Sequence, residues 1–233
     1  MTTTAIIVAA GSGSRFNSDT PKQFLEINGK PVIVHTTERF QSAPCIDSIV
    51  LVLAADQAQA FDSAAFSKVK KVVAGGSTRA QSVRNGLEAA SDADIVAVHD
   101  GARPLVSVAE IERTIAKAKE TGAACLVAPV TDTIKSVRGD EIADTLDRTK
   151  LRRALTPQAF KIDVLRKAFE GVDPSESVTD ECYLVEKLGH PIFIVEGSPR
   201  NIKITHPEDL ILAEALMNLE LETDNSELEA RSR

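Results

Sequence analysis

The fold is decided near the start of the chain, where residues 6–16 read IIVAAGSGSRF. The apolar run predicts a buried strand, and the small residues after it predict a loop whose backbone N–H groups can face phosphate oxygens. Phe16 stands where a dinucleotide-binding fold has its third glycine, and no P-loop pattern occurs in the chain. The loop therefore suits an anion without matching either motif, and an ordinary turn between a strand and a helix remains the alternative.

Outward from this loop, short apolar runs alternate with amphipathic segments. Apolar residues at helical spacing predict helices over 78–90 and 108–121, and Ser107 with Glu110 forms a capping box before the second. Pro31 suits the first turn of another helix over 31–42. Continuous apolar runs predict buried strands at 5–8, 48–53, 69–74, 94–98, 123–130 and 192–195. This alternation predicts an α/β fold with a mostly parallel, doubly wound sheet.

One segment, residues 132–149, departs from this alternation. Two short alternating stretches flank Arg138-Gly139-Asp140, which predicts an inserted β-hairpin arm. A hairpin alone is marginal in water, so we expect the arm to pack on another body, such as a second subunit. Residues 1–221 are expected to form a single domain, and the polar residues 222–233 a disordered tail.

The composition is that of a globular protein with an acidic balance. The chain has 233 residues, of which 43% are hydrophobic and 26% charged, and a net charge of −7. A pI near 5.2 argues against the broad basic surface that nucleic-acid binding uses. The apolar start is too short for a secretory signal or a membrane span, and the three cysteines show no metal or disulfide spacing. We therefore expect a cytoplasmic protein without a nucleic-acid or membrane partner.

Two cations follow the first loop. Arg15 ends it, and Lys22 stands seven residues later in TPKQF. Two cations near a backbone anion site can hold a triphosphate and oppose the charge that develops at a transferring phosphorus. Solvated surface charges are the alternative for both.

An acidic residue ends another predicted strand, in VHDGARP. Asp100 would lie at the carboxyl edge of the sheet, where open α/β proteins bind ligands, and a carboxylate there can hold Mg²⁺. Arg103, three residues on, suits a phosphate or a sugar hydroxyl. A helix cap or a turn is the alternative for Asp100, and His99 is expected to be a structural hydrogen-bonding group.

Two further segments carry candidate ligand contacts. Residues 75–82, GGSTRAQS, open a helix after a strand, so backbone N–H groups near Gly76, with Ser82 in the second turn, can meet a nucleobase or a phosphate. A plain loop and helix cap are equally consistent with this segment. Residues 201–205, NIKIT, predict a short alternating strand on which Lys203 is exposed, and a solvated lysine is the alternative there.

Eight motifs, taken in order, resemble those of the 2-C-methyl-D-erythritol 4-phosphate cytidylyltransferases, a family of the nucleotidyltransferase superfamily; they are VAAGSGSRF, TPKQF, GGSTRAQSV, VHDGARP, PVTDTIK, LDRTKLRRALTPQAF, TDE and NIKIT. The resemblance runs from about Thr3 to Leu216. It implies a Rossmann-like nucleotidyltransferase fold and a homodimer that exchanges the hairpin arm. It also implies transfer of CMP from CTP to 2-C-methyl-D-erythritol 4-phosphate, with Mg²⁺ and release of pyrophosphate, in isoprenoid precursor synthesis.

The resemblance implies roles for individual residues as well. Arg15 and Lys22 would stabilise the pentavalent transition state, while Arg148 and Lys203 would position the acceptor for attack. The residues that would cradle cytidine and the phosphates are Ala9, Ala10, Gly11, Gly13, Gly76 and Ser82. The residues that would bind the acceptor are Asp100, Arg103, Thr133, Thr156 and Thr179, with Asp100 also the metal ligand. Because Thr133 and Arg148 lie on the arm, they would reach the neighbouring subunit's site.

Three positions, Val8, Ser77 and Gly101, depart from the commonest pattern of this family. None of the three removes a charge that the resemblance assigns to catalysis. Ser77 leaves open how the base or the ribose is held on its side of the site.

Three other functions compete with this reading. Ribitol 5-phosphate cytidylyltransferases share several of the motifs, but Ala9-Ala10-Gly11 and Arg153-Ala154-Leu155 favour the methylerythritol enzymes. A non-catalytic nucleotide-binding protein is disfavoured because Arg15, Lys22, Asp100 and Lys203, which all belong to the motifs above, are retained together. An NAD-dependent oxidoreductase is disfavoured by Phe16.

Overall fold

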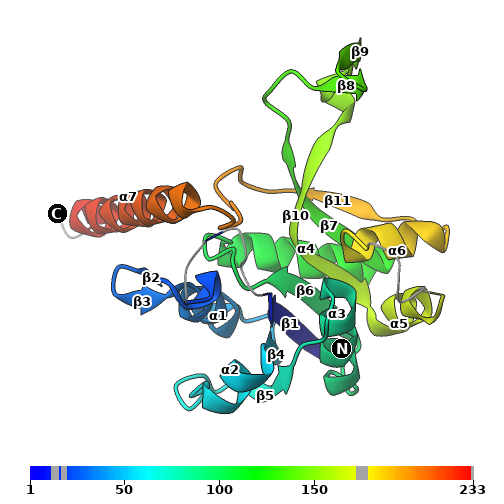
Figure 1. Cartoon of the computed structure of the whole chain (residues 1–233). Helices are drawn as coiled ribbons and strands as arrows, with labels where there is room; N and C mark the ends of the chain where they lie inside the picture. Colours follow the sequence, from blue (N-terminus) through cyan, green and yellow to red (C-terminus); the bar gives the residue numbers. More distant parts are fainter. Residues whose placement is uncertain (12–15, 17–19, 172–177, 232–233) are drawn as a thin grey trace.

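A computed structural model describes residues 1–11, 16, 20–171 and 178–231, with side chains as far as residue 220. Seven strands form one sheet in the order β11 (Phe193–Glu196), β7 (Ala123–Pro129), β10 (Arg152–Lys161), β6 (Ile95–Asp100), β1 (Thr3–Ala9), β4 (Ser48–Leu53) and β5 (Val69–Ala74). Neighbouring strands are parallel except at β10, which is antiparallel to both β6 and β7. The expected mostly parallel sheet is thus confirmed, and it lies at the centre of the molecule (Figure 1).

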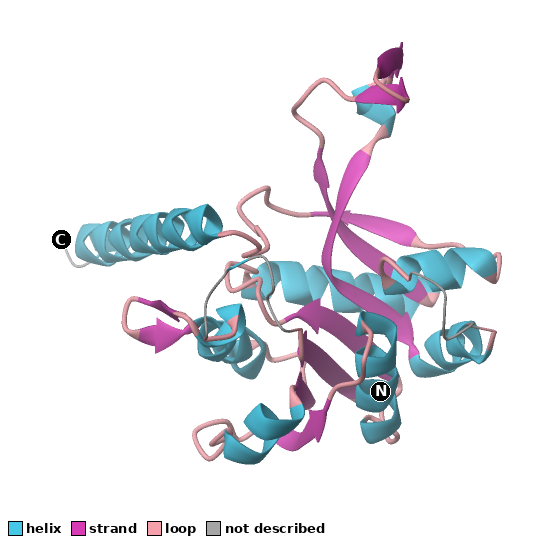
Figure 2. Cartoon of the chain, in the orientation of Figure 1, coloured by secondary structure: helices cyan, strands magenta, loops and turns pink. Residues whose placement is uncertain are grey.

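Helices cover both faces of this sheet (Figure 2). α1 (Val32–Ser42) and α4 (Val108–Thr121) pack on one face, and α3 (Arg79–Ala89), α5 (Ile162–Glu170) and α6 (Glu181–Lys187) on the other. Alternate residues of β1 divide between the layers, because Ile7 joins the cluster of α1 and α4 whereas Ile6 joins that of α3. Strands buried on both faces read as continuous apolar runs, which is why the sequence shows them clearly. The short α2 (Ala55–Ala60) lies beside β5.

The chain changes direction across the sheet at β1. It adds β4 and β5 on one side of β1 and then forms β6 on the other side. Val8 pairs with Asp100, so the carboxyl ends of β1 and β6 are neighbours. Open α/β sheets bind ligands at such a point, because the loops that leave the two strands diverge there.

Two segments differ from the pattern that the sequence predicts. The sequence does not indicate β10, whose first residues are charged and whose Pro157 lies where the pairing with β7 shifts, between Ala154 and Gln158. The predicted strand at 201–205 is wrong, because these residues form irregular backbone. Its alternation reflects the burial of Ile204, whose N–H donates to the carbonyl oxygen of Ala102 at 2.8 Å instead of joining a strand ladder.

The predicted hairpin arm is confirmed. β8 (Lys135–Arg138) and β9 (Glu141–Thr145) pair antiparallel, and the turn between them contains Gly139 at a φ of +59°. The arm projects away from the sheet (Figure 1), and every residue from 141 to 150 is exposed. Val137 and Ile142 are 68% and 66% exposed, so the arm buries few of its apolar side chains within its own chain.

The last helix continues further than the composition suggests. α7 (Pro207–Arg231) is helical over most of the segment 222–233, for which the sequence predicts disorder. From residue 208 to 231 the sequence has no glycine or proline and is rich in Glu, Leu and Ala, which favour a helix even without packing. Its first turns are anchored, because Ala213 and Met217 join a core cluster with Ile27 and Leu105. In the part of the chain that the structure describes, no helix is long and apolar enough to cross a membrane.

Candidate active site

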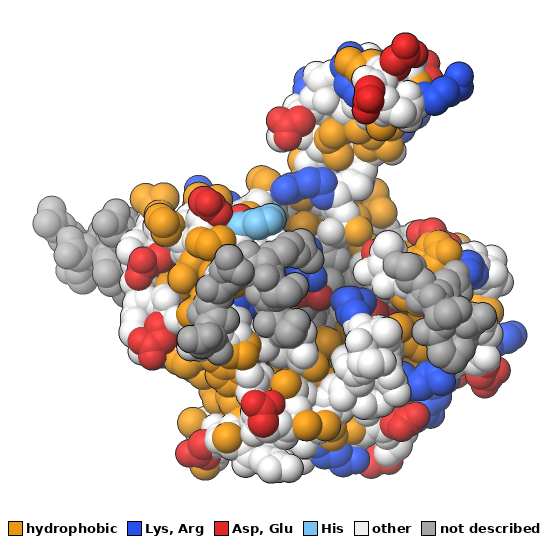
Figure 3. All heavy atoms as spheres, in the orientation of Figure 1, with side chains coloured by type: hydrophobic (Ala, Val, Ile, Leu, Met, Phe, Trp, Pro, Cys, Tyr) orange, Lys and Arg blue, Asp and Glu red, His pale blue; other side chains and the backbone are white. Residues whose placement is uncertain are grey.

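A cavity of about 400 Å³ opens at the carboxyl ends of β1 and β6. Its walls come from the loop after β1, the 3-10 helix η2 (Lys22–Phe24), the start of α3, the end of β6 and the segment before α7. In Figure 3, acidic and basic side chains meet in the hollow below the arm. The predicted site residues that line the cavity are Ala9, Ala10, Gly11, Lys22, Gly76, Ser82, Asp100 and Lys203.

The loop after β1 is held in place by Gln23. This residue is 2% exposed, and its Nε2 donates hydrogen bonds to the carbonyl oxygens of Ala9 at 2.7 Å and Gly11 at 3.2 Å. On the other side Gly75 approaches so closely that a Cβ there would lie 2.3 Å from the Cβ of Ala10. Among the described atoms none lies within 4 Å of a Cβ built at Gly11, so this part of the loop leaves room for a ligand.

Ser82 shapes the opposite wall. Its hydroxyl accepts a hydrogen bond from the N–H of Gly76 at 3.1 Å and donates one to the carbonyl oxygen of Thr78 at 2.9 Å. Thr78 in turn caps α3, because its hydroxyl accepts the N–H of Gln81. A ligand that uses the N–H of Gly76 must therefore share it with Ser82.

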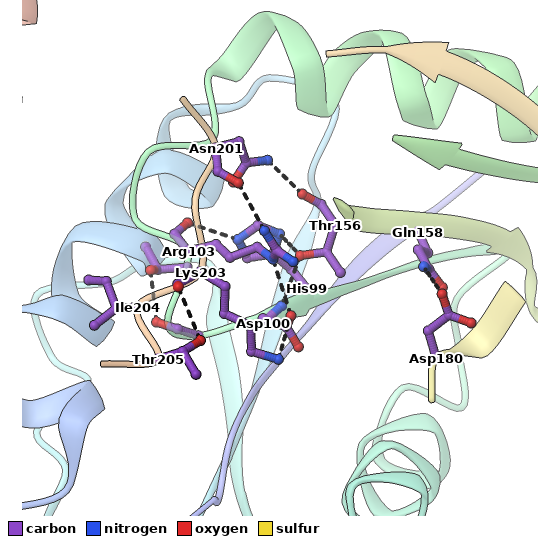
Figure 4. A network of polar contacts seen from close by, with 12 residues as sticks. His99, Asp100, Arg103, Thr156, Gln158, Asp180, Asn201, Lys203, Ile204 and Thr205 are labelled. Carbon is purple, nitrogen blue, oxygen red and sulfur yellow. Dashed lines mark hydrogen bonds and ion pairs between the residues drawn. The ribbon is translucent and has the colours of Figure 1, made fainter. Parts of the chain in front are cut away.

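Asp100 is the residue around which the charged side chains of the cavity gather (Figure 4). It is 7% exposed, and its carboxylate contacts Lys203 at 3.0 Å, Arg103 at 3.2 Å and Arg79 at 3.4 Å. Burial alone would raise the pKa of this carboxyl, but the charges of Arg79, Lys203 and Arg103 outweigh burial and hold the pKa well below its ordinary range. Asp100 is therefore an anion near neutral pH, surrounded by an excess of positive charge.

Arg79, the first residue of α3, also pairs with Glu181, the first residue of α6. Its Nη2 lies 3.0 Å from Oε2 of Glu181, and its Nη1 contacts Oε1. Burial opposes the charge on Arg79, but Glu181 and Asp100 outweigh it and raise the pKa of Arg79 above the ordinary value. Burial raises the pKa of Glu181, and Arg79 opposes that rise. The guanidinium thus joins a carboxylate in the cavity to one that is fully buried.

A hydrogen-bond network supports Asp100 (Figure 4). The N–H of Asp100 donates to Oγ1 of Thr156 at 3.2 Å, and this oxygen lies 2.9 Å from Nδ1 of His99. Burial lowers the pKa of His99 to about 4, and its Nε2 donates to the carbonyl oxygen of Arg103 at 3.1 Å. A neutral imidazole that donates at Nε2 must accept at Nδ1, so Thr156 donates its hydroxyl proton there. Asn201 completes the network by donating from Nδ2 to the carbonyl oxygen of Thr156 at 2.9 Å.

The segment that carries Lys203 is held by two other cations. Arg103 donates from Nη1 to the carbonyl oxygen of Asn201 at 2.9 Å, and Lys22 donates from Nζ to that of Ile204 at 2.7 Å. The Lys203 side chain is 38% exposed, against 12% for Arg103. A ligand in the cavity can therefore reach Lys203 more easily than Arg103.

The other predicted site residues that the structure describes do not line the cavity. Arg103 lies behind its lining, in contact with Asp100 at 3.2 Å. Thr133 and Arg148 are exposed on the arm, and neither lines the cavity of its own chain. Thr156 is 3% exposed, and its hydroxyl is used by the network around Asp100. Thr179 is exposed just before α6. Two predicted residues, Gly13 and Arg15, lie outside the described residues.

The sequence-based prediction misses three residues that shape the cavity: Gln23, Arg79 and Glu181. Arg79 carries a signal, because a cation in the first turn of a helix faces the positive end of the helix dipole and needs a carboxylate nearby. Glu181 carries another, since it lies on the same face of α6 as the buried Leu184 and Val185. Gln23 gives no signal of this role, because its partners are main-chain oxygens of Ala9 and Gly11, which every residue type supplies.

The residues fit a metal ion only in a limited way. Asp100 is the one carboxylate among the described residues that line the cavity, and the described part of the chain has no cluster of three or more His, Cys, Asp or Glu side chains able to hold a metal. Mg²⁺ needs only one or two carboxylates when substrate phosphates and water supply its other ligands. Asp100 already contacts three cations, so a metal would have to displace one, and Lys203 is the most exposed of them. The site therefore suits a metal ion held chiefly by nucleotide phosphates.

Comparisons with known proteins agree with one another. The family model described as IspD, 2-C-methyl-D-erythritol 4-phosphate cytidylyltransferase, matches residues 3–219. Relatives named 2-C-methyl-D-erythritol 4-phosphate cytidylyltransferase from Alkaliphilus oremlandii and Syntrophus aciditrophicus are 42% and 45% identical, with 92% and 93% of this chain and 94% and 96% of theirs covered. The structure of a 4-diphosphocytidyl-2C-methyl-D-erythritol synthase from Anaerococcus prevotii has a TM-score of 0.80 at 29% identity, over 93% of this chain and 96% of that one. That of a 2-C-methyl-D-erythritol 4-phosphate cytidylyltransferase from Thermus thermophilus has a TM-score of 0.75 at 33% identity, over 91% and 98%.

Proposed function

This chain belongs to the 2-C-methyl-D-erythritol 4-phosphate cytidylyltransferase family, and we propose that the cavity around Asp100 performs the family's reaction. The enzyme transfers CMP from CTP to 2-C-methyl-D-erythritol 4-phosphate, yielding 4-diphosphocytidyl-2-C-methyl-D-erythritol and pyrophosphate in the methylerythritol phosphate pathway to isoprenoid precursors. The observation that carries the location of the site is a single carboxylate among three cations, where the carboxyl ends of β1 and β6 meet.

CTP is proposed to bind between the loop after β1 and the start of α3. The residues that would cradle cytidine and the phosphates are Ala9, Ala10, Gly11, Gly13, Gly76 and Ser82. The small residues of the loop leave space there, and Gln23 restrains the loop before the nucleotide arrives. Such preorganisation lowers the entropy lost on binding.

The proposed chemical step is an in-line attack of the acceptor phosphate on the α-phosphorus of CTP. A phosphate oxygen forms the new P–O bond as the bond to the β-phosphate bridge breaks and pyrophosphate leaves with its electrons. A phosphate monoester is largely dianionic near pH 7, with a second pKa of about 6, so it needs no general base. His99 is in any case neutral, with both ring nitrogens engaged. Arg15 and Lys22 are proposed to stabilise the pentavalent transition state by charge.

The acceptor is proposed to bind on the Asp100 side of the cavity. Asp100 would accept hydrogen bonds from the hydroxyl groups of the acceptor, while Arg103 and Lys203 would contact the phosphate of the acceptor. The exposed Thr179 is proposed to contact the acceptor as well. Thr156 would contribute indirectly, by holding Asp100 in place, because its hydroxyl oxygen accepts a hydrogen bond from the N–H of Asp100.

Mg²⁺ is proposed as the cofactor, bound mainly by CTP phosphates with Asp100 as the protein ligand. When bound it would neutralise part of the triphosphate charge. The role of this chain is then to place Lys22 and Lys203 beside the phosphates and to keep Asp100 ionised.

The arm is proposed to complete the site of a second subunit in a homodimer. Thr133 and Arg148 are exposed on it and lie away from their own cavity, which supports a contact in the neighbouring site. The exposed Val137 and Ile142 would be covered in the same assembly.

A cytoplasmic location is proposed for the enzyme. All three cysteines, Cys45, Cys125 and Cys182, carry free thiols. Free thiols are typical of a reducing compartment.

The decisive test is pyrophosphate release from CTP with Mg²⁺ and 2-C-methyl-D-erythritol 4-phosphate, run beside ribitol 5-phosphate and beside a reaction without acceptor. We expect turnover with the methylerythritol substrate alone. Turnover with ribitol 5-phosphate alone would keep the chemistry and replace the acceptor. No turnover by folded protein that binds CTP would contradict the proposed function.

A further inference from the structure

Glu181 is a buried carboxylate to which the proposed reaction gives no role. It begins α6, its exposed fraction is 0%, and both of its carboxylate oxygens accept hydrogen bonds from Arg79. Carboxylates are rarely this buried without a specific partner, because removing the charge from water is costly. The placement of Glu181 therefore points to a task performed through Arg79.

Arg79 is shared unequally between two carboxylates. Its Nη2 lies 3.0 Å from Oε2 of Glu181, whereas its Nε and Nη2 both lie 3.4 Å from Oδ1 of Asp100. The closer contacts are those with Glu181, so Glu181 determines where the guanidinium lies. As the first residue of α3, Arg79 also meets the positive end of the helix dipole, which makes a second carboxylate more necessary.

This arrangement leaves one oxygen of Asp100 less tightly engaged than the other. Lys203 and Arg103 contact Oδ2 at 3.0 and 3.2 Å, while Arg79 faces Oδ1 at 3.4 Å. Without the charge of Glu181, attraction to Asp100 would draw the guanidinium onto Oδ1. Asp100 and Arg79 both line the cavity, so that movement would shorten the two 3.4 Å contacts with Oδ1 and leave this oxygen less free to accept from a ligand.

We infer that Glu181 is a positioning residue that restrains Arg79 and so keeps the Oδ1 side of Asp100 available to the acceptor substrate. The inference rests on the proposed function, because it needs Asp100 to contact 2-C-methyl-D-erythritol 4-phosphate. The acceptor would contact Asp100 directly, whereas CTP would reach Asp100 only through Mg²⁺ and would otherwise lie along the loop after β1 and the start of α3. The Kd for CTP is therefore compared without Mg²⁺.

The first test is Glu181→Gln, which keeps the shape and removes the charge. We expect kcat/KM for the acceptor to fall about tenfold, the loss typical of one hydrogen bond to a charged group. The Kd for CTP, measured by calorimetry, should stay within about twofold in the same protein. Glu186→Gln is the matched control, because Glu186 lies on the same helix but is exposed, and it should leave both quantities unchanged.

The second test uses the melting temperature, which does not depend on turnover. Arg79→Met leaves Glu181 buried without its partner and should lower the melting temperature. Adding Glu181→Gln to that variant should raise it again, whereas Glu181→Gln alone should lower it. A role of Glu181 independent of Arg79 would instead lower the melting temperature in both backgrounds.

Besides a melting temperature that falls in both backgrounds, three results would overturn the inference. One is an acceptor kcat/KM that Glu181→Gln changes by less than about twofold in an active enzyme. Another is a loss of CTP affinity as large as the loss with the acceptor, which would indicate a general structural role. The third is an inactive wild-type enzyme, which would refute the proposed function and the inference together, whereas the first two leave the proposed function intact.

Discussion

Asp100 and Arg148, both proposed to act on the acceptor, lie in opposite surroundings. Asp100 is 7% exposed and contacts cations from three segments of its own chain, whereas Arg148 lies in a stretch, 141–150, that is exposed at every residue. Asp100, held by several partners, loses little freedom when it binds a ligand. Arg148 is exposed and is held within the arm by a hydrogen bond from Nη1 to the carbonyl oxygen of Thr131, so it loses more. The charges around Asp100 are therefore arranged by the fold of one chain, whereas the arm would be placed by the neighbouring subunit in the proposed homodimer.

The largest expected effect comes from removing the buried member of this comparison, with Asp100→Asn. We expect the free energy of unfolding to fall by about 3 kcal/mol, as when one partner of a buried ion pair is lost. Pyrophosphate release with both substrates should fall by a factor of about 10²–10³, the loss typical of a preorganised electrostatic contact. Urea unfolding followed by circular dichroism and the release assay measure the two quantities.

Asp94→Asn is the matched control for this change. Asp94 precedes the same strand, β6, at its opposite end, and its side chain is 56% exposed. Exposed ion pairs contribute little, so activity and stability should be nearly unchanged. Equal losses in the two variants would mean that the burial of Asp100 is not what matters.

Mixing two inactive variants tests the proposed role of the exposed Arg148. Lys22→Ala removes a cation from the cavity and Arg148→Ala one from the arm, so each homodimer should be nearly inactive. In a mixed dimer one site would combine an intact cavity with an intact arm, and random exchange should restore about a quarter of the wild-type activity. Activity is measured after subunit exchange has been verified by native mass spectrometry. If exchange occurs and activity does not return, each site is built within one chain.

The support behind Asp100 should show in the pH dependence of stability. The pKa of His99 is lowered from 6.5 to about 4 in the folded protein, so between these values only the unfolded state binds this proton. The part of the free energy of unfolding that is linked to His99 is therefore fully present above pH 6.5. It is lost as the pH drops towards 4, by roughly 3 kcal/mol in total. The contribution of Asp100 to stability is constant across this window, because its ordinary pKa of 3.8 and its lowered pKa in the folded protein both lie below pH 4.

Urea unfolding at several pH values checks this prediction. His99→Asn should be less stable near neutral pH but should show a shallower loss towards pH 4. His206→Asn, at an exposed position, should retain the wild-type slope. A slope that His99→Asn leaves unchanged would assign the acid sensitivity to another group.

The smallest effect is expected from Gln23→Ala. It removes the hydrogen bonds that hold the carbonyl oxygens of Ala9 and Gly11, so the loop should lose order before CTP binds. The Kd for CTP should rise about fivefold, which corresponds to roughly 1 kcal/mol. Calorimetry measures this Kd, and Gln59→Ala, at an exposed position on α2, is the control. An unchanged Kd would show that the loop does not depend on Gln23.

Local patterns predict most of the fold. The apolar runs locate β1, β4, β5, β6, β7 and β11 within one or two residues of their bounds, and the capping box of Ser107 and Glu110 is confirmed. β10 is not predicted, because Arg152, Arg153 and Pro157 are untypical of a buried strand. The strand nevertheless connects the arm to the sheet. The strand predicted at 201–205 fails for the converse reason, since an alternating pattern also arises when a loop buries one side.

The candidate site is predicted less completely. Motifs indicate which charged residues line the cavity, because Lys22, Asp100 and Lys203 belong to recognisable segments. They do not indicate that Arg79 and Glu181 meet, since these residues are 102 positions apart and belong to helices on one face of the sheet. Thr156 shows the same limit, because its sequence context suggests a substrate contact whereas its hydroxyl is used by Asp100 and His99.

The sequence by itself determined the layered α/β architecture, the small residues of the loop after β1 and the supply of cations. These follow from local periodicity, small residues and charge, which act over a few positions along the chain. Only the tertiary structure decided which cations contact Asp100, that His99 is neutral and that the arm stays exposed. Those outcomes depend on the order of strands in the sheet and on burial, because both the strength of an ion pair and the cost of an unpaired charge are set by the distance and the water that the completed fold leaves between the groups.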